Sequence, residues 1–262
     1  MAGDFAVLRA RPGQSRERLV ARGILHNKRC YIQKVDGAQL KEARLVAALT
    51  QHEAARRLGV TQAYFSMVER GCRPVSSELA SKVMQVFELP ATALPLAEDG
   101  WTGRDSSSLA SALGALGYSG FSWLRGSAKT NPAAVLMGAL DCEDLDPRVT
   151  EALPWLVVAY PELDWDWLTQ NAKIRDRQNR LAFVVALAGQ IAAKKGNAYI
   201  AKVLADRVEK LRRSRLAVEG TLCRESMTQA ERKWLRTHRS PTARHWNLLT
   251  DLSLGQLDHV FQ

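Results

Sequence analysis

The hydrophobic pattern between residues 49 and 71 predicts two short helices joined by a tight turn. Thr50 and Glu53 have the spacing of a capping box, in which each side chain bonds to the other residue's backbone at a helix start. The apolar positions that follow recur at helical spacing: Ala54, Ala55 and Leu58. Gly59 can adopt the left-handed backbone conformation that ends a helix, so we expect this first helix to stop there.

A second helix is expected almost at once, because Thr61 is another good N-cap. Phe65 and Val68 lie on one face of this second helix, and Gly71 is expected to end it. Two short helices joined by a turn of this length form a helix-turn-helix.

Beyond residue 107 the pattern predicts helices and no strand of useful length. Asn131-Pro132, Asp146-Pro147 and Ser240-Pro241 each place a capping residue before a proline at the first helical position. Pro154 is expected to end or kink the helix that starts at Asp146. The other expected helices span residues 109–116, 164–194, 199–218 and 228–238, with a last one from 253. The chain is therefore predicted to be all-α, with a larger C-terminal helical bundle or short helical solenoid after the helix-turn-helix.

Residues 40–90 resemble the phage-repressor (Cro/CI-like, also called xenobiotic-response-element) family of helix-turn-helix domains. The resemblance rests on Leu40-Lys41, Arg44, Leu49-Thr50-Gln51, Ala55, Leu58-Gly59-Val60, Ser66, Glu69-Arg70-Gly71, Pro74 and Leu89-Pro90. Two positions depart from the family's pattern: Ala48 stands where glycine is usual, and Ala54 where leucine is common.

The resemblance implies a five-helix domain whose third helix, from about Thr61 to Arg70, enters the major groove of DNA. The residues that would face the bases are Gln62, Ala63, Ser66 and Met67. The residues that would hold phosphates are Lys41, Arg44, Gln51, Thr61, Arg70 and Arg73. The amide of Gln62 can pair in two places with adenine and Ala63 can touch a thymine methyl group, whereas Met67 suits polar base edges poorly. The family's operators are palindromic half-sites about one DNA turn apart, which implies a homodimer.

The distribution of charge divides the chain into regions. The net charge of +10 suits a nucleic-acid partner, yet residues 38–90 carry only seven basic against five acidic side chains. Residues 91–170 carry eleven acidic and four basic side chains, and residues 171–262 carry eighteen basic and eight acidic ones. We expect four segments: a basic arm at 1–37, the DNA-binding domain at 38–90, a linker at 91–107 and a helical partner-binding or dimerisation domain at 108–262. The arm either lies along DNA phosphates or is a loose tail.

No pattern in the sequence indicates a catalytic, cofactor or metal site. His52-Glu53-Ala54-Ala55-Arg56 has arginine where the zinc motif H-E-x-x-H needs its second ligand. Gly126-Ser127-Ala128-Lys129-Thr130 is similar to the end of a phosphate-binding loop but lacks the glycine before the lysine. The four cysteines form no C-x-x-C pair, and the longest apolar run, residues 181–193, is too short to span a membrane. We therefore expect a cytoplasmic protein that is not an enzyme and has no cofactor, no metal and no membrane partner.

Tryptophans and basic residues gather in the C-terminal half. Six of the seven tryptophans lie beyond residue 120, and a strongly basic helix is expected around residues 202–215. Trp165 and Trp167 are two residues apart, so either one is exposed at an interface or both pack inside the bundle. The basic helix is either simply solvated or docks one of three partners: an acidic protein, DNA beside the operator, or the acidic segment of the same fold or of a dimer partner.

Together these observations predict a sequence-specific DNA-binding repressor that acts as a homodimer on a double-stranded operator. This DNA-binding family, combined with a helical tail that lacks ligand-pocket signals, resembles antitoxins that repress their own toxin–antitoxin operon. We therefore hypothesise an antitoxin whose C-terminal helical domain neutralises a toxin. The alternative is a stand-alone repressor whose helical domain senses a small-molecule ligand in an apolar cavity.

Overall fold

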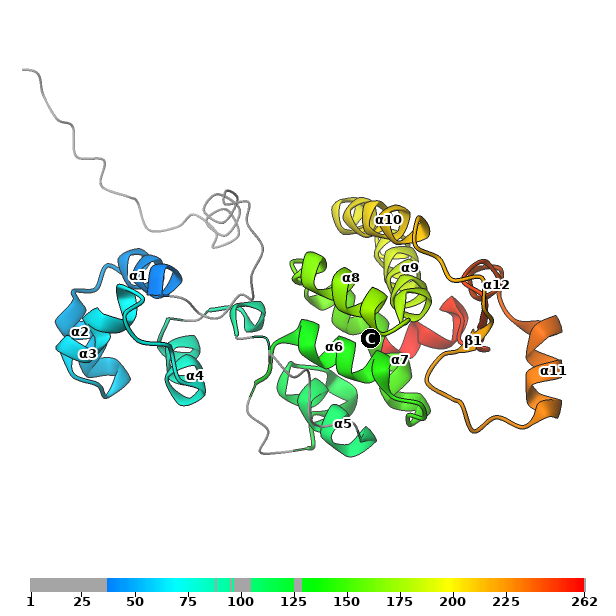
Figure 1. The fold of residues 1–262 in the computed structure, drawn as a ribbon, viewed down its shortest axis with the longest axis horizontal. Coiled ribbons are helices and arrows are strands. Elements are labelled where there is room, and N and C mark those ends of the chain that lie inside the picture. Colours follow the sequence, from blue (N-terminus) through cyan, green and yellow to red (C-terminus); the bar gives the residue numbers. More distant parts are fainter. Residues whose placement is uncertain (1–36, 88, 95, 97–104, 125–128, 262) are drawn as a thin grey trace, which may run out of the picture. The chain divides into compact units, whose positions relative to one another are not determined.

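The structure is a computed structural model that describes residues 37–87, 89–94, 96, 105–124 and 129–261 (Figure 1). The predicted basic arm at residues 1–37 lies outside the described residues except for Gly37, and so does most of the glycine-containing segment 126–130. Almost all of the described secondary structure is helical, which confirms the predicted all-α class.

The N-terminal helices follow the predicted pattern closely. They are α1 (Gly37–Val46), α2 (Gln51–Leu58), α3 (Gln62–Glu69) and α4 (Ser77–Val86), followed by the 3-10 helix η2 (Ala91–Ala93). The fifth helix that the family resemblance implied is thus a single 3-10 turn within residues 37–96. The core of this region is formed by residues including Leu40, Ala54, Ala55, Leu58, Phe65, Val68 and Val83.

Local capping signals set the ends of α2 and α3. The hydroxyl of Thr50 accepts a hydrogen bond from the Glu53 backbone N–H at 3.2 Å, and the Glu53 carboxylate accepts one from the Thr50 N–H at 2.9 Å. Gly59 ends α2 with φ of +69°, and the Thr61 hydroxyl accepts a bond from the Tyr64 N–H at 3.2 Å. These contacts confirm the predicted capping box and the short turn between the two helices.

The C-terminal region is a set of helices packed around α9. The helices are α5 (Ser106–Ala115), η3 (Ser119–Phe121), α6 (Pro132–Asp141), α7 (Pro147–Ala159), α8 (Trp165–Ile174), α9 (Gln178–Lys194), α10 (Ala198–Arg212), α11 (Gln229–His238), α12 (Pro241–His245) and η4 (Leu254–Phe261). Helix α9 lies between α7 and α10 (Figure 1), and twelve of its seventeen residues are buried. A helix that is apolar on most sides is suited to the centre of such a bundle.

Two sequence-based boundaries differ from the structure. The single helix predicted from Asp164 to Lys194 is two helices, because the chain turns at Asp176, which has φ of +55°. Of the two effects predicted for Pro154, ending the helix is excluded, because the helix continues to Ala159, and a kink stays a prediction. The helix expected to reach residue 218 ends at Arg212.

A two-residue parallel pair, β1 (Gly220–Thr221) and β2 (Leu248–Leu249), joins segments that the sequence predicted as non-strand. Arg180 anchors this region from α9. Its buried guanidinium donates to the carbonyls of Leu140, Cys142 and Thr221 at 2.7–2.8 Å, and to the carboxylate of Glu225 at 2.9 Å. The Arg180 side chain thereby satisfies backbone carbonyls at the end of α6 and in the strand β1.

The predicted linker, residues 91–107, is not uniformly extended. Its first residues form η2, and the Asn131 side chain donates to the backbone carbonyls of Thr92 and Leu94 at 3.1 and 2.6 Å. Residue Asp105 caps α5 at the other end of the segment. The domain boundary placed here from the sequence stays a prediction. Within the part of the chain that the structure describes, every helix is too short or too polar to cross a bilayer.

Candidate nucleic-acid interface

The outer face of α3 carries the residues that were predicted to face DNA bases. Gln62 and Ala63 are exposed at its N-terminal end, and Ser66 and Met67 are half-buried one turn later. The opposite face is sealed, because Phe65 and Val68 are fully buried. Helix α3 therefore presents its first turn to solvent, as a helix that enters a DNA groove must.

A chain of polar contacts runs from α1 through α3 and α2 to the start of α3. The Nε of Arg44 on α1 donates to the Glu69 carboxylate at 2.7 Å. The other carboxylate oxygen of Glu69 accepts from the amide nitrogen of Gln51 at 2.6 Å. The amide oxygen of Gln51 in turn accepts from the amide nitrogen of Gln62 at 3.4 Å.

These polar contacts determine which hydrogen-bonding groups of Gln62 remain available to a ligand. A carboxylate can only accept, so the Gln51 amide must direct its nitrogen to Glu69 and its oxygen to Gln62. The Gln62 amide then donates one N–H to Gln51, and its other N–H and its carbonyl oxygen remain available to solvent or a ligand. One donor beside one acceptor is the pattern that pairs with N7 and N6 of adenine in the major groove.

The residues predicted to hold phosphates fall into two groups. Lys41, Arg70 and Arg73 are exposed, Thr61 is exposed at the N-cap of α3, and Gln51 is half-buried in the polar chain. Arg44 does not belong with them, because its side chain is 10% exposed and bonds to Glu69 and to the carbonyl of Leu49. We therefore correct the predicted phosphate contact of Arg44 to a structural role that orients Glu69.

Sequence reasoning missed the role of Glu69. The signal was present, since Arg44 and Glu69 each occupy a position on the apolar stripe of their own helix. Opposite charges placed on two facing apolar stripes indicate a buried ion pair. Arg56 and Arg57, exposed at the end of α2, are two further cations on the surface of this domain.

The tryptophans of the C-terminal region are placed as follows. Trp165 is buried with 5% of its surface exposed, and Trp167 is half-buried against the core. The second of the two predicted arrangements, in which both rings pack within the bundle, is therefore the one found. The exposed tryptophans among the described residues are Trp123 and Trp234, at 71% and 53%.

Among the described residues, no group of three or more His, Cys, Asp and Glu side chains is arranged to hold a metal ion. His52, in the sequence that partly matches a zinc motif, is exposed on α2.

Residues 37–96 match a family model described as a helix-turn-helix domain. No curated protein and no solved structure matches the chain. The match and the geometry together identify this segment as a helix-turn-helix domain, a kind of domain typical of DNA-binding transcription regulators.

Proposed function

We propose that this protein is a transcriptional repressor that reads a specific operator with the first turn of α3. The observation that carries the proposal is the contact of the Gln62 amide with the Gln51 amide, at 3.4 Å, at the exposed start of that helix. An amide that a neighbouring side chain orients loses less conformational freedom on binding, so its donor and acceptor favour one base over the others. The cations Lys41, Arg70 and Arg73 would set register on the backbone without reading sequence. The proposal includes a homodimer on a palindromic site and assigns the chain no catalytic role.

The operator can be found by selecting binding sites from a library of random DNA duplexes with the full-length protein. Gln62→Ala should then weaken binding to the selected site about 5- to 150-fold, since one bidentate base contact contributes about 1–3 kcal/mol. Binding to unrelated duplex DNA should change little. Gln229→Ala, at the exposed first position of α11, is the matched control and should leave both affinities unchanged.

Failure to enrich any site, or equal affinity of the wild type and Gln62→Ala for the selected site, would show that α3 does not read bases. The selected site should also be a palindrome whose half-sites lie about one helical turn apart. A single asymmetric site bound by a monomer would contradict the homodimer.

The finer part of the proposal is that the helical region from residue 108 binds a protein toxin and that the chain represses its own operon as an antitoxin. It is supported by the joining of a helix-turn-helix to a helical region that carries exposed aromatic and basic side chains, among them Trp234 and Lys233. Co-expression with the product of the adjacent reading frame tests it. A stoichiometric complex and restored growth are expected, and toxicity unaffected by this chain would remove the antitoxin role without touching DNA binding.

The alternative, sensing of a small molecule, needs an apolar cavity with a few converging polar groups. A groove between α8 and α10 is lined, apart from Trp165, by charged and polar residues. This groove gives the small-molecule alternative no specific support.

A further inference from the structure

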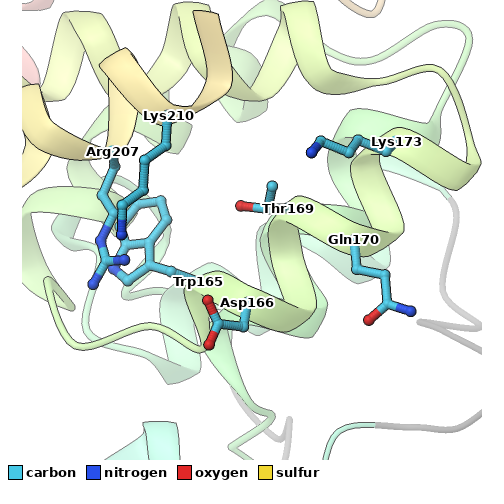
Figure 2. Close-up of a pocket in the computed structure, with 7 residues that line it drawn as sticks. All are labelled: Trp165, Asp166, Thr169, Gln170, Lys173, Arg207 and Lys210. Carbon is cyan, nitrogen blue, oxygen red and sulfur yellow. The ribbon is translucent and has the colours of Figure 1, made fainter. Parts of the chain in front are cut away.

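A groove lies between α8 and α10, and the Trp165 ring lies beside Arg207 and Lys210 at one end of it (Figure 2). Its volume is about 290 Å³, and its lining residues are Trp165, Asp166, Thr169, Gln170, Lys173, Arg207 and Lys210. The indole N–H of Trp165 donates to the carbonyl of Pro161 at 2.9 Å, which fixes the ring. The Arg207 guanidinium lies 5.5 Å from the ring centroid, in a cation–π arrangement.

The cations of the groove are not neutralised by the fold. Arg207 and Lys210 extend from α10 toward Trp165, and Lys173 points across the groove from the far end of α8 (Figure 2). In the described part of the chain, none of these three side chains makes an ion pair with a carboxylate. The neighbouring Arg212, by contrast, pairs with Glu209 at 3.3 Å. Three unpaired cations converging on one depression attract an anionic group.

The pattern of charge favours a protein over DNA as the occupant. Asp166 stands at the same groove, beside Trp165 in the first turn of α8, and it would repel a continuous phosphate backbone. A polypeptide can match three cations and one carboxylate with side chains of both signs. Arginine is enriched among the residues that contribute most to protein–protein binding, and the half-buried Arg207 is held over the Trp165 ring at this groove.

We propose that the groove formed by Trp165, Lys173, Arg207 and Lys210 is the docking site for an acidic segment of a partner protein. This inference rests on the proposed function, which gives the helical region a protein partner, and it names the place and the chemistry of that contact. Carboxylates of the partner pair with Lys173 and Lys210, and an apolar side chain beside them packs on the Arg207 guanidinium that covers the Trp165 ring.

The test uses the full-length protein and a short fluorescein-labelled peptide composed of glutamate and leucine, with a lysine–leucine peptide as the reference probe. The wild type should bind the acidic peptide and not the basic one, and binding should weaken with salt. Arg207→Glu with Lys210→Glu should weaken it by about tenfold or more, because both charges reverse. Asp166→Asn should tighten it about two- to threefold, an effect in the direction opposite to that of a general loss of structure.

The matched control reverses two cations outside the groove, Lys202→Glu with Arg213→Glu, both exposed on or next to α10. This control should bind the peptide nearly as well as the wild type. Equal weakening by both double variants, or no tightening by Asp166→Asn, would overturn the proposal in favour of general charge attraction. The groove variant is Arg207→Glu with Lys210→Glu. If this variant binds the operator more weakly while peptide binding is unchanged, the groove contacts DNA and the docking proposal is overturned.

Operator binding measured on the same variants separates this inference from the proposed function. The groove variant should bind the selected operator as the wild type does. If it does and peptide binding is also unchanged, the docking site is wrong and the repressor proposal stands. If no operator is found for the wild type, the repressor proposal fails whatever the peptide does.

Discussion

At the scale of single residues, Ala48 is strained. Its φ of +53° lies in the left-handed region, which costs a residue with a Cβ about 1–2 kcal/mol relative to glycine. The related family usually has glycine here, and the conformation explains why. The turn is required because Leu49 must return to the core while its N–H bonds to the carbonyl of Arg44 at 3.1 Å.

Ala48→Gly should therefore stabilise the protein by roughly 0.5–1 kcal/mol, the strain relieved minus the added freedom of glycine in the unfolded chain. The side chain of Ala48 is exposed, so no packing is lost. Urea unfolding measures the change. Ala47→Gly is the control. The N–H of Ala47 bonds in helical fashion to the carbonyl of Ala43, and glycine is less favourable than alanine at a helical position, so this variant should be destabilised by a similar amount. Destabilisation by Ala48→Gly would contradict the argument.

The buried pair of Arg44 and Glu69 gives a second prediction at this scale. Arg44→Met should cost about 3–5 kcal/mol in urea unfolding, because it leaves the Glu69 carboxylate, 1% exposed, without its cation. Adding Glu69→Leu should recover most of that stability, since apolar replacements of buried ion pairs are often neutral. Operator discrimination should not recover, because Gln51 has then lost the carboxylate that orients it. Full recovery of both properties would show that the polar chain has no part in reading DNA.

At the scale of helices, the ends that depend on neighbouring residues were predictable and those that depend on distant contacts were not. Thr50, Thr61 and Thr228 cap helices as their local sequence predicts. The break between α8 and α9 has no glycine or proline to mark it, and Asp176 adopts its positive φ there. Arg180 bonds to groups about forty residues away in either direction. Such contacts leave no periodic pattern in the sequence, so the pairing of β1 with β2 was missed.

The capping boxes make the stability of α2 and α11 depend on pH. The pKa of Glu53 lies below its ordinary 4.5, first because it accepts the backbone N–H of Thr50 and then the Thr50 hydroxyl. Thr228 lowers the pKa of Glu231 in the same way. A carboxylate whose pKa is lowered by folding stabilises the fold above its ordinary pKa, and loses that contribution as the pH falls through the lowered value.

Glu53→Gln combined with Glu231→Gln should therefore be less stable than the wild type at neutral pH, and the difference should shrink as the pH falls below 4.5. Thermal unfolding at several pH values measures this. Thr50→Ser keeps a hydroxyl at the N-cap and should retain the wild-type dependence. If the stability difference between the double variant and the wild type grew at low pH, the proposed role of the two carboxylates would be wrong.

At the scale of the whole molecule, the excess positive charge and the helix-turn-helix domain lie in different regions. Residues 171–262 carry most of the excess positive charge, whereas the helix-turn-helix domain is only mildly basic. The fold explains part of this separation. Several C-terminal arginines pair within the fold, as Arg232 does with Glu225 and Arg236 with Glu219. A basic composition therefore overstates how much of this region is available to DNA, and the sequence alone does not reveal which cations are paired.

The salt dependence of operator binding tests this division. Each phosphate contact contributes about −0.9 to the slope of log affinity against log salt concentration. Replacing Lys41, Arg70 and Arg73 together by glutamine should thus make the slope shallower by roughly 2–3, while the preference among selected sites stays the same. Replacing Lys202 and Arg213 by glutamine should leave the slope unchanged, because these exposed cations lie in the helical region that we propose binds a protein partner and not DNA. If the second set lowers the slope as much as the first, the phosphates are held by the C-terminal helices as well, and the assignment of DNA binding to residues 37–96 alone is wrong.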